Sequence, residues 1–338
     1  MMNVTIAAND MSGKYNWGIK NYALNLVKNM DKDVKIVIVE KKMSGIMDYI
    51  RYPKFVKKSL PPGGILHLAS QTFGYFSRFG MKNRTIATCH DLMAFSNPEF
   101  FENRKYAAFS RLMIRGVEKC EKIIAVSEFT KHQLVKYLGV DGGKIYVIHS
   151  GISEDFWPRK KKNDTDYIVY FGSEEKRKNV AAFIEAFCML KKEYPEIKLV
   201  KNYNNPFIWK KILSMGLERD VIVTGNLTQK QMAEYYSSAK AFVYPSLFEG
   251  FGFAPLEAMA CGCPVAASDA AAVPEILGDA PLYFNPLDAS EICNKVSMIL
   301  ESRKLSRKMS AKSVKHAKKF TWKKTSKKTK KVYEEVAV

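Results

Sequence analysis

Two glutamates lie eight residues apart in an apolar, glycine-containing stretch of the sequence. Residues 245–265 read PSLFEGFGFAPLEAMACGCPV, which places Glu249 and Glu257 among phenylalanine and leucine side chains. A carboxylate in apolar surroundings is costly to desolvate unless a cation or a ligand pairs with it, so both acids are candidate binding residues. Carboxylates readily accept hydrogen bonds from the vicinal hydroxyls of a sugar.

The residues between the two acids predict a site for phosphate. Pro255 can open a helix and Gly262 can end it, which would place Glu257 in the first helical turn. Free N–H groups at the helix start, and close approach of backbone at Gly252, would favour an anion. A diphosphate with a hydroxyl-rich group on either side is the layout of a nucleotide sugar. The pattern alone leaves open a strand–loop–helix joint in which Glu257 only caps the helix.

Apolar, strand-sized segments alternate with amphipathic helical segments along most of the chain, and this alternation must position the two acids. Such alternation is typical of parallel sheets covered by helices on both faces. Strands are expected at 4–10, 34–39, 64–70, 84–90, 122–127, 144–151, 167–173, 197–202, 221–226, 241–246 and 264–268, and helices at 19–30, 103–120, 128–138, 179–194, 229–239 and 255–262.

A polar and charged segment at 154–166 divides the chain, whose 338 residues are more than one core usually serves. We expect an α/β protein of two Rossmann-like, doubly wound domains, with the ligand in the cleft between them. The predicted organisation is a first domain over 1–155, a linker over 156–166, a second domain over 167–315, and a basic helix over 316–338 that packs back towards the first domain.

The net charge of +20 is concentrated near the end of the chain, where residues 303–331 hold fourteen lysines and arginines and no acid. A solvated helical face is the default interpretation, and an anionic membrane surface is the next. Nucleic acid is not expected, because the segment has little aromatic interleaving and no binding motif. With no membrane-spanning run and no secretion signal, we expect a cytoplasmic protein that can lie on the inner face of the membrane.

No metal site is expected from the sequence. The six cysteines lack the spacing of a disulfide framework, which suits reduced thiols, and Cys261-Gly-Cys263 has no second pair of ligands nearby. Asp164-Thr165-Asp166 is a D-x-D in the polar linker, where a solvated segment is the better interpretation.

Beyond these patterns, residues 249–265 resemble the E-x7-E signature of family 4 glycosyltransferases, which are retaining nucleotide-sugar enzymes of the GT-B fold. The resemblance extends over nearly the whole chain. It includes the first glycine loop (17–26), the H-D-L element of the mannosyltransferase-like branch (88–101), the segment that leads to the interdomain linker (126–158), the R-K-N phosphate loop (172–187) and the closing helix (320–336).

In the second half, the resemblance implies a donor site. Glu249 would contact the donor sugar near the reacting carbon, and Glu257 would bind the ribose hydroxyls. Lys178, with Arg177, would neutralise the diphosphate. Further donor contacts are implied for the backbone N–H groups of Gly252, Phe253 and Ala254, and for Leu227 beside the nucleobase.

In the first half, the resemblance implies contacts to the reacting groups. Gly18 would let the first loop approach the diphosphate and the acceptor. His90 and Asp91, at a strand end, would face the donor sugar or the acceptor hydroxyl, although a lone strand-end histidine is often structural.

Three segments depart from the family pattern. Ser173 stands where many members have arginine, and Lys201 stands where many have glycine. His149 and Ser150 replace the commoner V-x-N-G pattern in VIHSG. With Ser173 one cationic contact of the family pattern is absent, and Lys201 makes one loop unusual, whereas Glu249, Glu257 and Lys178 match the pattern.

The resemblance implies a retaining, metal-independent hexosyltransferase of cell-surface polysaccharide or glycolipid synthesis, acting on a glycan or lipid-linked acceptor. GDP-mannose is the favoured donor, and UDP-glucose, UDP-galactose and UDP-N-acetylglucosamine are alternatives. A sugar-nucleotide epimerase, or a non-catalytic subunit that only binds the nucleotide sugar, would keep the fold and change the activity.

Overall fold

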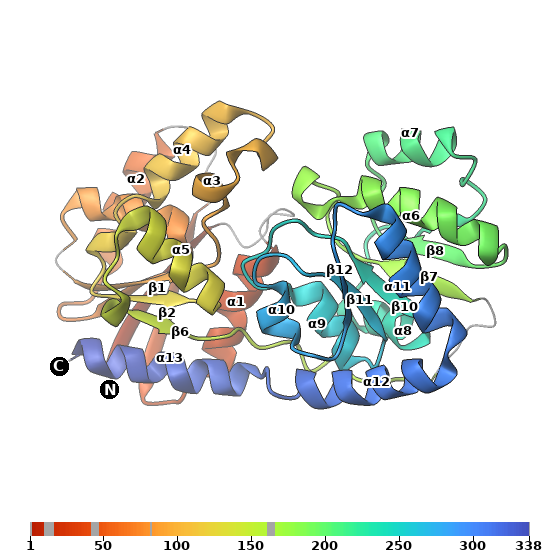
Figure 1. Cartoon of the computed structure of the whole chain (residues 1–338). Helices are drawn as coiled ribbons and strands as arrows, with labels where there is room; N and C mark the ends of the chain where they lie inside the picture. The colour runs from red at the N-terminus through yellow and green to blue at the C-terminus, as the bar shows by residue number, and fades with distance from the viewer. Residues whose placement is uncertain (1, 10–16, 42–46, 82, 161–165, 338) are drawn as a thin grey trace. The chain divides into compact units, whose positions relative to one another are not determined.

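The computed structural model describes residues 2–9, 17–41, 47–81, 83–160 and 166–337, which form two compact units (Figure 1). The first unit comprises the chain up to Gly151 together with the segment from Phe320 onward, and the second comprises Ile152–Lys319. The chain therefore leaves the first unit once and returns to it for its last helix.

The first unit is built on a six-stranded parallel sheet with the strand order β2-β1-β3-β4-β5-β6. The order reverses beside β1, which is the topology of a doubly wound fold. Its elements, with η for 3₁₀ helices, are β1 (Met2–Asn9), α1 (Trp17–Lys28), β2 (Val34–Lys41), α2 (Asp48–Ser59), β3 (Ile65–Leu68), η1 (Gln71–Phe79), β4 (Arg84–Cys89), α3 (Met93–Ser96), η2 (Pro98–Phe100), α4 (Arg104–Ile114), η3 (Val117–Lys119), β5 (Lys122–Ala125), α5 (Glu128–Leu138), η4 (Gly142–Lys144), β6 (Ile145–Val147) and α13 (Trp322–Ala337).

The second unit repeats this architecture with the strand order β12-β11-β10-β7-β8-β9, again all parallel. Here the order reverses between β7 and β10. Its elements are β7 (Tyr167–Tyr170), η5 (Lys176–Lys178), α6 (Val180–Glu193), β8 (Lys198–Lys201), α7 (Pro206–Ser214), β9 (Val221–Val223), α8 (Gln229–Ser238), β10 (Ala241–Tyr244), α9 (Phe253–Ala260), β11 (Val265–Ser268), α10 (Val273–Leu277), β12 (Leu282–Phe284), α11 (Ala289–Glu301) and α12 (Arg303–Ala317).

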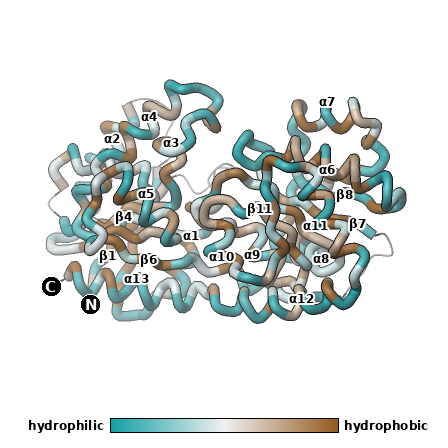
Figure 2. Tube along the Cα trace, viewed as in Figure 1, coloured by the Kyte–Doolittle hydropathy of each residue, from teal (hydrophilic) through white to brown (hydrophobic). Residues whose placement is uncertain are grey.

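The central strands are buried along their whole length because helices cover both faces of each sheet (Figure 1). Every residue of β3, β7, β10 and β11 is buried. In the second unit, one core is formed by α6, α7 and α11 against the sheet, with Phe183, Phe187, Ile212 and Val296 at its centre. The hydropathy colouring shows the same contrast between apolar strands and polar outer helix faces (Figure 2). The expected α/β class and the GT-B fold, with its two doubly wound parallel sheets, are confirmed.

The last helix, α13, belongs to the first unit. Tyr333 Oη lies 2.6 Å from Nδ1 of His67 on β3, and Ser326 donates to the carbonyl of Leu26 at 3.2 Å. The other ring nitrogen of His67 lies 2.7 Å from Thr88 Oγ1, so both nitrogens of this buried histidine have partners. Burial lowers the pKa of His67 to about 3, which keeps the ring neutral.

Most of the basic residues of 303–331 lie on two helices, α12 of the second unit and α13 of the first, and α13 occupies most of the helix expected over 316–338. α12 ends at Ala317, and α13 begins at Trp322 after the buried Phe320. The break lies where the chain passes from the second unit to the first. In the part of the chain that the structure describes, no helix has both the length and the apolar character needed to cross a membrane.

Candidate functional site

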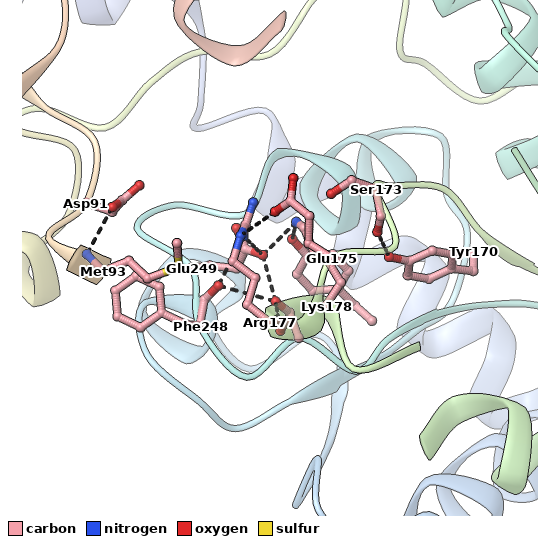
Figure 3. Close-up of polar contacts among 11 residues, drawn as sticks. Asp91, Met93, Tyr170, Ser173, Glu175, Arg177, Lys178, Phe248 and Glu249 are labelled. Atoms are coloured by element: carbon pink, nitrogen blue, oxygen red, sulfur yellow. Dashed lines mark hydrogen bonds and ion pairs between the residues drawn. The ribbon is translucent and has the colours of Figure 1, made fainter. Parts of the chain in front are cut away.

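Glu249, Arg177 and Lys178 meet at the point where the strand order of the second sheet reverses (Figure 3). Lys178 follows β7, and Glu249 follows the neighbouring strand β10. Because the connections from two such strands run in opposite directions, their carboxyl ends leave a crevice in which doubly wound folds bind ligands. Sheet topology therefore brings together residues 71 positions apart in the sequence.

One carboxylate oxygen organises this cluster. Glu249 Oε1 accepts hydrogen bonds from Lys178 Nζ at 2.6 Å, Arg177 Nη1 at 2.8 Å and Ser246 Oγ at 2.7 Å. Lys178 Nζ also donates to Tyr244 Oη at 3.0 Å. Charge-assisted contacts of this number and length hold both cations against the acid.

The loop that carries the cations is fixed by its own backbone. Asn179 adopts a left-handed conformation, with φ 51° and ψ 35°, between η5 and α6. Asparagine tolerates this conformation better than most residues, and here its side-chain amide donates to the carbonyl of Pro286 at 2.6 Å. Leu247 N donates to the carbonyl of Arg177 at 2.7 Å, so the two loops are also joined through their main chains.

The pKa values of Glu249 and Glu257 are shifted in opposite directions. Burial opposes the ionisation of Glu249, but the nearby Arg177 and Lys178 outweigh it and lower the pKa of Glu249 to about 2. Glu257 is buried as well, and burial raises its pKa to about 8. Glu249 is therefore a carboxylate at neutral pH, whereas the raised pKa of Glu257 favours its protonated form.

Burial lowers the pKa of Lys178, in the direction opposite to that expected for an ion-paired lysine. Arg177 adds to this effect because it places a second positive charge beside the ammonium group, while Glu249 opposes it. Lys178 shares one carboxylate with another cation, so an incoming anion would relieve the repulsion between them.

The start of the helix after Glu249 differs from the sequence prediction. α9 begins at Phe253, two residues before Pro255, and Gly252 caps it with φ 95°. Glu257 therefore lies in the second turn, and the expectation of the first turn was wrong. A residue with φ near 95° must be glycine for the chain to enter the helix here, and Gly262 follows the helix with φ 75°, as expected for a C-terminal stop.

This earlier start puts three of the predicted backbone donors at the helix terminus. Gly252, Phe253 and Ala254 are the cap and the first two residues of α9, whose N–H groups have no carbonyl partner within the helix. Their role in binding phosphate stays a prediction. Leu227 lies half-buried between β9 and α8, next to Thr228, which caps α8.

His90 and Asp91 follow β4 in the first unit. His90 Nε2 donates to the carbonyl of Ala69 at 2.9 Å, which leaves Nδ1 as the acceptor, and its backbone N–H donates to Gln71 Oε1 at 3.0 Å. Burial lowers the pKa of His90, so the ring is neutral. Asp91 Oδ1 accepts a hydrogen bond from Met93 N at 3.0 Å at the start of α3, as Figure 3 shows.

Gly18 lies in the first turn of α1, and the loop before it falls outside the described residues, as does most of the D-x-D segment. His90, Asp91 and Gly18 belong to the first unit, whereas the glutamates and cations belong to the second. A shared site between the units stays a prediction.

Sequence reasoning missed four residues that support the predicted ones. Ser246 and Tyr244 contact Glu249 and Lys178, Ser268 donates to the carbonyl of Ser246 at 2.6 Å, and Gln71 holds the backbone of His90. Ser246 could have been suspected, because a hydroxyl at a strand end is well placed to contact the following loop. The other three depend on contacts between elements far apart in the sequence, which no local pattern encodes.

Lys201, one of the departures noted above, is fully buried at the end of β8. Its Nζ lies 2.7 Å from Oε1 of Glu174, which is also buried and lies four residues before Lys178. Glu174 Oε2 accepts a hydrogen bond from Asn205 N at 2.7 Å. The pair joins the loop after β7 to the loop after β8. Ser173, which also departs from the family pattern, lies in the loop after β7. Its carbonyl accepts a hydrogen bond from Tyr170 Oη at 2.5 Å.

Two family models match the chain in succession. Residues 45–156 match Glycosyltransferase Family 4, and residues 151–316 match Glycosyl transferases group 1. The two matches together span residues 45–316, which is most of both units.

Curated relatives include two enzymes of Escherichia coli. The chain is 26% identical to O-antigen chain mannosyltransferase B over 64% of its own length and 61% of that protein. It is 31% identical to the serotype-specific mannosyltransferase WbdA over 62% of its own length and 28% of that protein. The chain thus spans less than two thirds of the length of these relatives.

A solved structure of Anabaena Alr3699/HepE in complex with UDP and glucose has the same fold, with a TM-score of 0.80. The alignment covers 99% of this chain and all of that one, at 15% sequence identity. At this identity the likeness concerns the arrangement of the elements alone.

Proposed function

Because the chain belongs to the glycosyltransferases described by the family 4 and group 1 models, we propose that it transfers a hexose from a nucleotide-diphosphate sugar to a glycan or lipid-linked acceptor. GDP-mannose is the proposed donor, since the curated relatives named above are mannosyltransferases. We place this activity in the cytoplasm, at the inner face of the membrane, in the synthesis of a cell-surface polysaccharide or glycolipid.

The observation that carries this proposal is the cluster of Glu249, Arg177 and Lys178 beside the start of α9. Two cations and a helix N-terminus at a topological switch point suit a diphosphate. An ionised acid among them suits the hydroxyls of a sugar attached to that diphosphate.

In the proposed reaction, the bond between the anomeric carbon and the diphosphate oxygen breaks while the acceptor oxygen attacks from the same face. The acceptor proton passes to the departing diphosphate, and Lys178, Arg177 and the α9 terminus stabilise its growing charge. Glu249 is ionised and held by three donors, so it acts as a hydrogen-bond acceptor that orients the sugar. Retention of configuration and independence from metal are parts of the proposal.

The test is a panel of GDP- and UDP-sugars, assayed for thermal stabilisation and for nucleotide release in the presence of a chelator. A donor held at 100 times its Kd should stabilise the protein by about 2.7 kcal/mol. Stabilisation and release by GDP-mannose alone would support the proposal. A response to a UDP-sugar alone would overturn the donor assignment, and release only after metal is added would overturn metal independence.

Catalysis and stereochemistry need a separate readout. With an accepted oligosaccharide, the anomeric configuration of the product, measured by NMR, should match that of the donor. Stabilisation without turnover on any acceptor would favour the non-catalytic binding subunit, and inversion would exclude the same-face mechanism.

A further inference from the structure

Two helices of the first unit expose large apolar side chains between lysines and arginines. α2 presents Ile50 and Phe55 to solvent, and α4 presents Tyr106, Phe109 and Leu112. Phe55 is 52% exposed and Tyr106 is 61% exposed, which is unusual for side chains of this size. The helices are neighbours, because Tyr49 of α2 and Phe109 of α4 are in edge-to-face contact at 5.1 Å (Figure 1).

The same surface, which we call the α2–α4 face, is strongly basic. The exposed residues on these helices and at their ends include the cations Arg51, Lys54, Lys57, Lys58, Arg104, Lys105 and Arg115. α4 contains no acid, and Asp48 of α2 is buried, so Glu102, just before α4, is the nearest exposed acid in the sequence.

Helices with protruding aromatic and aliphatic side chains among cations are typical of proteins that lie in the interface of an anionic membrane. The core of a protein–protein interface is instead depleted of charge. We propose that the α2–α4 face docks on an anionic lipid bilayer, with Phe55, Tyr106 and Leu112 entering the headgroup region and the cations contacting lipid phosphates.

The basic C-terminal segment does not have these properties. α13 exposes Lys323, Lys327 and Lys328 but buries its apolar side chains against the first unit, and no large apolar side chain is exposed on the described residues of α12 and α13. Such a surface attracts anions without inserting into a membrane.

The two basic surfaces also lie on opposite faces of the first sheet. On β3, Leu66 and Leu68 point into the core that includes α2, η1 and α4, whereas His67 between them contacts α13. Alternate residues of a strand point to opposite faces of a sheet, so one flat bilayer cannot contact both surfaces. The α2–α4 face and α13 are therefore competing candidates that experiment can separate.

The experiment is sedimentation of the full chain with vesicles of phosphatidylcholine, with and without phosphatidylglycerol, in the absence of donor and acceptor. The intact protein should bind the anionic vesicles and retain part of this binding at about 1 M salt, where charges are screened beyond about 3 Å. The triple variant Phe55→Ser, Tyr106→Ser, Leu112→Ser should lose at least about tenfold in partitioning at both salt concentrations, because it removes apolar insertion.

Matched controls make the result specific. Phe207→Ser with Leu287→Ser removes exposed apolar side chains from the second unit and should leave vesicle binding unchanged. Lys323→Gln, Lys327→Gln, Lys328→Gln should leave the binding at high salt unchanged. Phe55→Leu with Tyr106→Phe keeps the face apolar and should bind like the intact protein, which excludes an effect of misfolding.

Wild-type partitioning by the serine triple variant would overturn the proposal, as would loss of high-salt binding in the α13 variant. If the intact protein ignored anionic vesicles but sedimented as a dimer that the serine variant disrupts, the face would be an interface between copies of the chain. Because no sugar nucleotide is present, these outcomes are independent of the proposed transfer reaction.

Discussion

At the scale of single residues, Glu249 connects the cationic loop to the loop after β10. Its contacts with Lys178, Arg177 and Ser246 give the acid a fixed position and a low pKa. Glu257, eight residues later, has the same side chain and a raised pKa because burial is not offset there. The environment of each acid, rather than its type, sets the state in which it meets a ligand.

Lys178→Ala should reduce kcat by at least about 100-fold, the scale expected for the loss of one preorganised donor. The matched control is Lys176→Ala, which removes an exposed lysine from the same short helix and should leave kcat nearly unchanged. Steady-state turnover of the accepted donor measures both. A near-normal kcat in Lys178→Ala would remove this residue from the proposed machinery.

The pKa of Glu257 predicts how stability depends on pH. In the folded protein the acid keeps its proton up to about pH 8, whereas the unfolded chain releases it near pH 4.5, so stability is lost as pH rises between these values. Glu257→Gln cannot ionise and should lose less thermal stability than the wild type over this range. Equal slopes of Tm against pH in the two proteins would contradict the buried, protonated state.

The low pKa of Glu249 predicts that its contribution to stability is lost in acid, whereas that of Glu257 is lost as pH rises. The folded pKa of Glu249, about 2, lies below the ordinary 4.5, so its contribution to stability is present above pH 4.5 and is lost as pH falls towards 2. Glu249→Gln should therefore be less stable than the wild type at neutral pH, and the difference should shrink in acid. Urea unfolding at several pH values measures this difference, and a gap that stays constant down to pH 2 would argue against the paired carboxylate.

At the scale of elements, the loops after β7 and β8 are joined by a buried ion pair. Lys201 and Glu174 lie 2.7 Å apart, with side chains 0% and 1% exposed, and Gly172 N donates to Asn202 Oδ1 at 3.1 Å beside them. These contacts support the loop that leads to Lys178, and they account for a lysine where glycine is common in the family.

Lys201→Met should destabilise the protein by about 3–5 kcal/mol, because it leaves the carboxylate of Glu174 buried without its cation. Adding Glu174→Gln should restore much of the loss, since glutamine can still accept the hydrogen bond of Asn205 N. Urea denaturation measures both variants.

The control for this cycle is Lys198→Met on the same strand. Lys198 pairs with Asp220 at 2.7 Å, with its side chain 28% exposed, and such a pair contributes about 1 kcal/mol or less. If Lys201→Met lowered the free energy of unfolding no more than Lys198→Met, the buried pair would not support the loop. The same would follow if the double variant Lys201→Met, Glu174→Gln were less stable than Lys201→Met alone.

At the scale of the whole molecule, the chain enters and leaves the first unit at one place. A Cβ atom on Gly151 would lie 2.2 Å from the backbone nitrogen of Trp322 and 2.5 Å from the carbonyl carbon of Thr321. Thr325 Oγ1 donates to the carbonyl of His149 at 2.8 Å nearby. The end of the first strand–helix series is thus in close contact with the returning helix.

Gly151→Ala should destabilise the protein by about 1–3 kcal/mol, because backbone cannot move aside as a flexible side chain can. Gly142→Ala is the matched control, since its Cβ would meet nothing within 4 Å, and it should stay within about 0.5 kcal/mol of the wild type. Chemical denaturation of both variants checks this, and equal stability would show that α13 tolerates displacement at its start.

The sequence by itself determined the succession of strands and helices, and with it two doubly wound units. Strands that are buried on both faces are continuous apolar runs, such as YIVY in β7 and AFVY in β10, and the helices between them have amphipathic spacing. The short motif around Glu249 and Glu257, and the R-K-N loop, were also visible, because each lies within a few residues of chain. The sequence did not predict the exact start of α9. Gly252 caps this helix through its backbone conformation, and the position of Pro255 does not indicate that conformation.

Only the tertiary structure decided which of these residues meet and in what state. Lys178 contacts Glu249 because β7 and β10 are neighbours in the sheet, a pairing that depends on strand order rather than on any local pattern. The partner of Lys201 and the opposite pKa shifts of the two glutamates have the same origin. Desolvation and charge pairing arise from segments far apart in the chain, and they exist only once those segments are packed together.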